Sequence, residues 1–171
     1  MNNNIQIYTD GAARGNPGMA GWAAVFLSGG KVIFEIGGRK DHATNNQMEL
    51  MAVIEALKYV HKNKIAMLIE IFCDSKYVIL GATEWVFGWM KNNWRNAAKK
   101  PVLNRELWES LHELTEELKP KWIYVEGHAG IKYNERADEI ATSFADGAPV
   151  ELVKTHSTDS TSSLQESSGQ K

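Results

Sequence analysis

Four acidic residues occupy places from which their carboxylates could converge: Asp10, Glu49, Asp74 and Asp138. Asp10 ends an apolar alternation that predicts a strand over residues 5–9. Asp74 ends a near-continuous apolar run over residues 66–74, as expected for a strand covered on both faces. If the two strands are parallel neighbours, both acids lie at the same carboxyl edge of the sheet, where open α/β sheets bind ligands.

The other two acids lie on predicted helices. Thr44 and Gln47 form a capping box, and the apolar residues that follow recur at helical spacing to about His61. Glu49 lies at the border of that helix's apolar face, and Asp138 lies at the corresponding border of the last predicted helix. Each helix could therefore lean one acid over the same sheet edge.

A cluster of these acids would favour bound cations. Two like charges about 4 Å apart repel by roughly 4 kcal/mol at an effective dielectric of about 20. The candidate ligands are all oxygen donors, which favours a hard ion such as Mg²⁺ or Mn²⁺ over zinc. Two such ions can activate a water molecule and stabilise a leaving oxygen in phosphodiester cleavage.

Each acid taken alone also has a simpler structural interpretation. Asp10 could start an Asx turn, and Asp74 could be the N-cap of the following helix. Glu49 and Asp138 could be solvated helix acids. The sequence around each acid is therefore needed to decide between a structural and a catalytic role.

The order of elements predicts a mixed α/β sheet with helices on both faces. Three strands come first, over residues 5–9, 20–28 and 31–37, and Ser-Gly-Gly joins the last two in a hairpin. Helices and strands then alternate: a helix from Thr44, the strand 66–74, a helix after Asp74, a helix with an apolar stripe from Leu107 to Leu118, the strand 121–127 and a last helix around Ala137 to Phe144.

Length and composition bound the class of protein. The 171 residues suit one domain, and 43% hydrophobic residues is ordinary for a globular protein. Apolar runs fall short of the roughly 18 residues of a membrane span and the polar start lacks signal-peptide features, so we expect a cytoplasmic protein without membrane association. The net charge is −2, but one stretch carries bases without a single acid: Lys91, Arg95, Lys99, Lys100 and Arg105.

The residues around the four acids resemble a known family. They read YTDGAARGNPG around Asp10, TNNQMELMAVIEAL around Glu49, IFCDSKYV around Asp74 and VEGHAGIKYNERADEIA around Asp138. In this order and spacing they resemble type 1 ribonuclease H, particularly the single-domain bacterial enzymes, from about Ile5 to Ala145. The resemblance implies the ribonuclease H fold: a five-stranded mixed sheet, three antiparallel strands and then parallel ones, flanked by helices on both faces, with a basic handle at about residues 85–105.

The resemblance also implies an activity and a cofactor. Family members hydrolyse the RNA strand of RNA–DNA hybrids by two-metal-ion catalysis, leave 5′-phosphate and 3′-hydroxyl ends, and remove RNA primers and hybrids during replication and repair. By position, the family's metal-binding carboxylates resemble Asp10, Glu49, Asp74 and Asp138, with two Mg²⁺ ions expected and Mn²⁺ as a substitute. His128, in the GHAG loop, resembles the family histidine that assists proton transfer or product departure.

Amide and basic side chains are expected to recognise the hybrid. The wide minor groove exposes the 2′-hydroxyls that distinguish RNA from DNA. By resemblance, the predicted substrate contacts are Asn16, Thr44, Asn45, Asn46, Lys76, Trp85, Trp89, Lys91, Arg95, Lys99, Lys100 and Asn134. Three alternatives stay open. Asn16 could be a turn residue, Asn45 and Asn46 could simply occupy the first turn of the helix, and the two tryptophans could pack the handle's own small core. Lys76 departs from the many bacterial relatives that carry an amide there.

We predict a catalytic domain over residues 1–148 and a Ser/Thr-rich tail over 149–171. Nine of the seventeen residues 155–171 are Ser or Thr, so the tail buries little and is expected to be disordered. The expected partner is an RNA–DNA hybrid bound by a monomer, and the sequence indicates no particular protein partner. Two other functions suit such a fold: a binding module without catalysis, which loss of a carboxylate would favour, and the core of a DNA transposase or resolvase.

Overall fold

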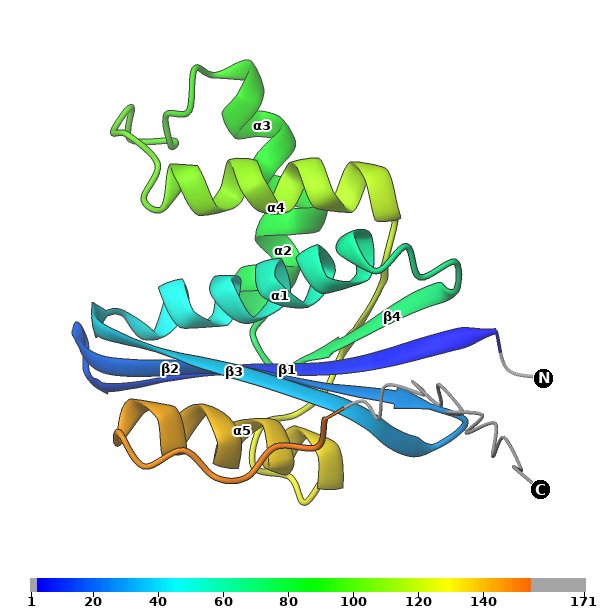
Figure 1. Cartoon of the computed structure of the whole chain (residues 1–171). Helices are drawn as coiled ribbons and strands as arrows, with labels where there is room; N and C mark the ends of the chain where they lie inside the picture. The colour runs from blue at the N-terminus through cyan, green and yellow to red at the C-terminus, as the bar shows by residue number, and fades with distance from the viewer. Residues whose placement is uncertain (1–2, 155–171) are drawn as a thin grey trace, which may run out of the picture.

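A five-stranded sheet has helices on both faces, and on one face a further helix packs on the outside of the helix that covers the sheet (Figure 1). The computed structural model describes residues 3–154. The strands are β1 (Asn4–Gly15), β2 (Gly18–Ser28), β3 (Lys31–Ala43), β4 (Leu68–Cys73) and β5 (Lys121–Tyr124). The helical segments are α1 (Asn45–Lys62), α2 (Lys76–Leu80), the π-helical turn η1 (Gly81–Trp85), α3 (Val86–Lys91), α4 (Arg105–Leu118) and α5 (Lys132–Ala145). Within the described residues, every helix is too short or too polar to cross a membrane.

The strand order β3-β2-β1-β4-β5 puts β1 and β4 at the centre of the sheet. The first three strands pair antiparallel as a meander. β4 then pairs parallel to β1, and β5 pairs parallel to β4. The predicted mixed α/β sheet, with three antiparallel strands followed by parallel ones, is therefore confirmed.

The prediction that the first strand ends at Asp10 is wrong. β1 continues to Gly15, and Asp10 pairs with Ala23 of β2 in the middle of an antiparallel ladder that closes with Gly15 opposite Gly18. The residues after Asp10 are small and do not alternate, so their sequence gives no strand pattern; pairing with β2 holds them extended. The turn at Asn16 and Pro17 comes several residues later than predicted. Two other predicted strand ends also differ from the structure. β3 continues to Ala43 and not to residue 37, and β5 ends at Tyr124 and not at residue 127.

Helix α1 covers one face of the sheet. Thr44 is its N-cap: the Thr44 side chain accepts from the backbone of Gln47, and the Gln47 side chain accepts from the backbone N–H of Thr44, as the capping box predicts. Apolar residues of α1 and α4 pack with β1 and β4 into the largest core cluster, which includes Leu50, Ile71 and Trp108. The free energy of burying this apolar face fixes α1 against the sheet.

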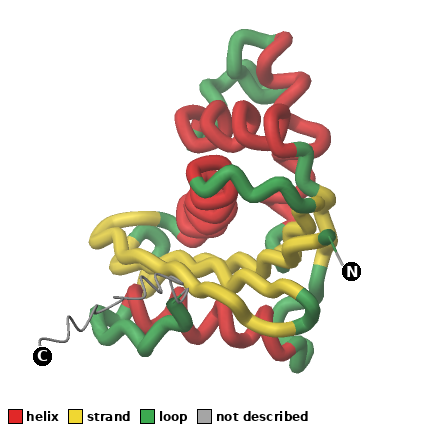
Figure 2. The backbone as a smooth tube through the Cα atoms, turned by 45° about the vertical axis from the view of Figure 1, so that its right-hand side comes forward, coloured by secondary structure: helices red, strands yellow, loops and turns green. Residues whose placement is uncertain are grey.

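Helix α5 covers the opposite face, as Figure 2 shows from a second direction. Ala137, Ile140 and Ala141 of α5 pack against β2 in a second core cluster. The approach is close at Gly21 of β2, where an added Cβ would lie 2.1 Å from the carbonyl oxygen of Ala141. A glycine is therefore required there for helix and sheet to touch.

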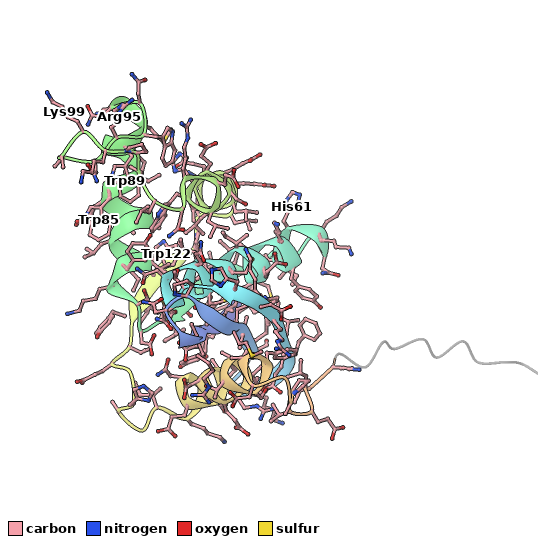
Figure 3. All side chains as sticks on the ribbon, turned by 90° about the vertical axis from the view of Figure 1, so that its left-hand side faces the viewer. His61, Trp85, Trp89, Arg95, Lys99 and Trp122 are labelled. Carbon is pink, nitrogen blue, oxygen red and sulfur yellow. The ribbon has the colours of Figure 1, made fainter. Side chains whose placement is uncertain are left out.

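The handle segment, residues 85–105, projects beyond the helix layer. It runs from the end of η1 through α3 and a loop back to α4. Figure 3 shows Trp85 and Trp89 along this projection and Arg95 and Lys99 near its tip. The base of the projection is tight, since an added Cβ at Gly81 would lie 2.0 Å from the Trp108 ring.

Residues 149–154, the start of the predicted tail, lie against the edge strand β3. The backbone N–H of Glu35 donates to the Val153 carbonyl, and the Val153 N–H donates to the Glu35 carboxylate. Arg136 of α5 donates two hydrogen bonds to the same carboxylate, at 2.7 and 2.9 Å. One buried carboxylate thus connects β3, α5 and the segment after α5. The rest of the predicted tail, 155–171, lies outside the described residues.

Candidate active site

Three of the four predicted carboxylates converge at one edge of the sheet. Asp10, Glu49 and Asp74 each offer an oxygen atom, and these oxygens lie within 4.8 Å of one another. The last parallel pair of β1 and β4 is Thr9 with Cys73, and the residue that follows each of them in the chain is one of the acids. This register produces the juxtaposition predicted for Asp10 and Asp74, although β1 itself continues.

Glu49 reaches the cluster because α1 lies directly on β1 at Gly11. An added Cβ at Gly11 would lie 2.4 Å from the backbone nitrogen of Glu49. Any side chain at this position would push the first turn of α1 away from Asp10. The backbone N–H of Gly11 also donates to Asp10 Oδ1 at 2.9 Å, which fixes that carboxylate.

Burial makes the cluster electrostatically unfavourable. Asp10 and Glu49 are each only 5% exposed. Burial first, and then the charge of Asp74, raise the pKa of Asp10 to about 8. Burial and the neighbouring Asp10 also raise the pKa of Glu49. The pKa of Asp74 is raised by burial, against the opposing effects of Asn134 and His128. Such shifts are typical of functional sites.

The fourth acid and the predicted histidine lie close to the carboxylate cluster and line the cavity above it. Asp138 on α5 raises the pKa values of both Asp10 and Asp74 through its charge. His128 lies in the loop before α5 with a positive φ of 56°. Asn134, predicted as a substrate contact, is buried at 2% exposure beside Asp74, and that contact stays a prediction.

The cavity above the acids has a volume of about 430 Å³. The predicted residues Asp10, Asn45, Glu49, Asp74, His128 and Asp138 line it. Sequence reasoning missed Arg14, Ser75, Gly127 and Thr142, which also line it. Arg14 and Ser75 lie within the motifs already singled out, and only the three-dimensional arrangement indicates that they face the cavity.

The residues present suit divalent cations. The donors are carboxylate oxygens, and Cys73 is buried behind them with burial raising the pKa of its thiol. Glu49 Oε2 is buried and has no hydrogen-bond partner among the described residues. An unpartnered buried carboxylate oxygen is costly unless a cation binds it. Asp10, Glu49 and Asp74 could therefore hold a divalent ion, with Asp138 close by.

A second cavity, of about 580 Å³, adjoins the first. Predicted contacts Asn16, Thr44, Asn45, Asn46 and Trp89 all line it. Asn16 is more than a turn residue, because its Oδ1 accepts from the backbone N–H of Asn45 at 3.0 Å. Sequence reasoning missed the chain of hydrogen bonds along this cavity, from Gln47 to Asn104 to the Tyr77 hydroxyl, at 3.2 Å each.

The other predicted contacts are divided among three places. Lys91, Arg95 and Lys99 line a hollow of about 470 Å³ on the handle segment, and Lys100 is exposed beside them. Trp89 packs on the Trp108 ring at 5.3 Å between centroids, whereas Trp85 stays 39% exposed. Lys76 begins α2, with its Nζ 5.2 Å from the centroid of the Tyr124 ring. None of these residues lines the cavity above the carboxylates.

Comparison with known proteins agrees with this arrangement. The ribonuclease H family model matches residues 2–146. A ribonuclease H of Aromatoleum aromaticum is 46% identical over 82% of this chain and 90% of its own length. The crystal structure of LC9-RNase H1, a type 1 enzyme, matches with a TM-score of 0.74 and 25% identity over 91% of this chain and 79% of that one.

A further solved structure contains a nucleic acid. LC11-RNase H1, determined in complex with an RNA/DNA hybrid, matches with a TM-score of 0.62 and 29% identity over 84% of this chain and 98% of that one. The carboxylate cluster, the sheet order and the sequence similarity along nearly the whole described chain all agree. The chain therefore belongs to the ribonuclease H family.

Proposed function

We propose that this protein hydrolyses the RNA strand of RNA–DNA hybrids, with two divalent metal ions, Mg²⁺ in the cell, held by Asp10, Glu49, Asp74 and Asp138. The observation that carries the proposal is the convergence within 4.8 Å of carboxylate oxygens from two buried acids, Asp10 and Glu49, and the half-buried Asp74. Bound there, the ions supply a nucleophilic water at neutral pH and neutralise charge on the phosphate. The orphaned Oε2 of Glu49 supports this use of the site.

The chain's own residues supply position and proton transfer. Attack by water at phosphorus, with the 3′-oxygen as the leaving group, gives 5′-phosphate and 3′-hydroxyl ends. His128 is exposed and lines the cavity on a loop in which Ala129 and Gly130 are also exposed, so its ring is available to a reacting oxygen as a proton carrier or to assist product departure.

Recognition of the hybrid is assigned to the surface that continues from the carboxylates. The cavity lined by Asn16, Asn45 and Asn46 offers amide groups to the minor groove, and Thr44 stands beside them at the N-terminus of α1. The bases of the handle segment would neutralise backbone phosphates further along the duplex. The hybrid-bound structure of LC11-RNase H1 supports this substrate class. A monomer, acting in the cytoplasm on primers and hybrids of replication and repair, completes the proposal.

The test is a cleavage assay with a strand-labelled RNA–DNA hybrid. Purified protein is incubated with and without Mg²⁺, alongside double-stranded and single-stranded RNA, and an Asp10→Asn variant is the matched control. Cleavage of only the RNA strand of the hybrid, lost with EDTA and in the variant, is the expected result. The product ends are identified by whether a ligase can join the 5′-phosphate and whether a polymerase can extend the 3′-hydroxyl. Hybrid binding without metal-dependent cleavage would instead make this chain a binding module.

A further inference from the structure

The cavity above the carboxylates contains one permanent positive charge. Arg14 is the single Lys or Arg among the described residues that line it. It stands on β1 four residues beyond Asp10, near the end of the strand that the sequence did not predict to continue. The hydrogen bonds and charge of Asp146 raise the pKa of Arg14, and the charge of Asp138, which lines the same cavity, adds to this effect.

Asp146, just after α5, fixes the orientation of this cation. Arg14 Nε donates to Asp146 Oδ1 at 2.6 Å, and Nη2 donates to Oδ2 at 2.9 Å. This bidentate pair engages two of the five N–H donors of the guanidinium. The side chain is 57% exposed. Among residues 3–154, no hydrogen bond engages the N–H groups of Nη1, so they are available to a ligand. Because the guanidinium is already held in place, binding a ligand costs little further side-chain entropy.

Stability does not explain the pair. Both of its side chains are largely exposed, at 57% and 44%, and exposed ion pairs stabilise proteins little. The Glu35–Arg136 pair, whose carboxylate is 1% exposed, already connects α5 to the sheet. The placement at the cavity rim therefore calls for a ligand-directed explanation.

The proposed substrate supplies one. A phosphodiester strand that enters a cavity of carboxylates brings further negative charges on either side of the scissile phosphate. Ions held by the acids would neutralise charge at the scissile phosphate and would leave the phosphates on either side of it to other groups. A guanidinium at the rim, with a free edge, is the side chain best suited to bind an adjacent phosphate.

We propose that Arg14, held by Asp146, is a substrate-positioning residue that binds a phosphate of the RNA strand next to the scissile one. The RNA strand is chosen because Arg14 lines the same cavity as the acids that cleave it, whereas the handle segment lies elsewhere. This inference rests on the proposed hydrolysis of hybrids.

A binding assay tests the inference separately from cleavage. Fluorescence anisotropy measures the Kd for a labelled RNA–DNA hybrid in EDTA across a range of KCl concentrations. All proteins carry Asp10→Asn, so the result does not depend on catalysis. Arg14→Gln is expected to raise Kd roughly tenfold and to reduce the slope of log K against log salt by about 0.7 to 0.9. Asp146→Asn leaves the charge of Arg14 in place but no longer fixes the orientation of its guanidinium. Kd is therefore expected to rise less than in Arg14→Gln, while the slope stays at the value of the Asp10→Asn protein.

Lys58→Gln is the matched control, because Lys58 is a cation of similar exposure, 56%, in a surface ion pair on α1. It should leave both Kd and slope at the parent values. The inference is overturned if Arg14→Gln leaves the slope unchanged, or if Lys58→Gln lowers it equally. In the parent background, the cleavage assay should then show a raised KM and a nearly unchanged kcat for Arg14→Gln. If Arg14→Gln changes the slope as expected but the protein without Asp10→Asn does not cleave hybrids, the proposed hydrolysis fails and the phosphate contact stands.

Discussion

Asp10→Asn is expected to stabilise the metal-free protein while removing its activity. The carboxyl of Asp10 is buried, and its pKa is raised to about 8 in the folded state, compared with about 3.9 in an unfolded chain. The folded protein therefore keeps this proton over a pH range in which the unfolded chain releases it. Raising the pH through that range favours unfolding.

The magnitude follows from the two pKa values. Each pH unit above the unfolded pKa costs about 1.4 kcal/mol until the pH reaches the folded pKa near 8. The stability that the Asp10 proton contributes is fully present below about pH 4 and declines as the pH rises toward the folded pKa, by on the order of 4 kcal/mol at pH 7. The amide variant has no proton to lose, and its oxygen can still accept from Gly11. Its advantage over the parent should therefore grow with pH.

Urea denaturation in EDTA at pH 5, 6, 7 and 8 measures this difference. Asp41→Asn is the control, since the Asp41 side chain is 88% exposed and its substitution should change stability by less than about 0.5 kcal/mol. Added Mg²⁺ should raise the stability of the parent by mass action and that of Asp10→Asn far less. A variant that is less stable than the parent at pH 7 in EDTA, or whose advantage does not increase with pH, would refute the electrostatic reasoning.

Three further substitutions test how the site is supported. Glu35→Gln weakens the buried pair with Arg136 and should lower the free energy of unfolding, measured in urea, by about 3 kcal/mol. Arg136 and a backbone N–H outweigh the effect of burial and hold the pKa of Glu35 below its usual value. The parent should therefore be more stable than the variant above about pH 4.5, with a smaller difference in more acid solution, and a pH-independent difference would contradict this. Gly81→Ala, which helix propensity alone would favour, should destabilise by about 1–3 kcal/mol because its Cβ meets Trp108, so a raised Tm would disprove the close contact. Thr44→Ala removes the N-cap of α1 and should cost about 1 kcal/mol, whereas Thr44→Ser should restore most of it, as thermal melts can show.

The sequence was sufficient for features whose cause is local. The capping box at Thr44 and Gln47 predicts the start of α1 because both hydrogen bonds lie within four residues. The apolar run before Asp74 predicts a central strand because burial on both faces requires one. The convergence of the acids follows from these elements once β1 and β4 are parallel neighbours.

Features with distant causes could not be predicted in the same way. The extension of β1 to Gly15 depends on β2, and residues 11–15 lack any strand pattern of their own. Asp74 is not the N-cap of α2, because Ser75 takes that place through its hydroxyl. Arg14 and Asp146 lie 132 positions apart in the sequence, so neither residue's local sequence indicates its partner. Each of these results from packing between segments far apart in the chain.

The destabilised acids stay together because the backbone around them cannot relax. At Gly11 the first turn of α1 lies against β1, and at Gly21 the end of α5 lies against β2. At Gly11 the neighbouring residue Met48 is buried in a small cluster with Ala20 and Ala43, and the following turns of α1 belong to the largest core. At Gly21 the contact belongs to the core on the opposite face of the sheet. Moving Glu49 away from Asp10 would require α1 to lift from the larger core, at a cost of several kcal/mol of buried apolar surface. In the metal-free protein a bound proton relieves the repulsion, because the pKa of Asp10 is raised to about 8. A cation bound by the acids would relieve it in the same way, and under the proposed function that is the state in which hydrolysis occurs.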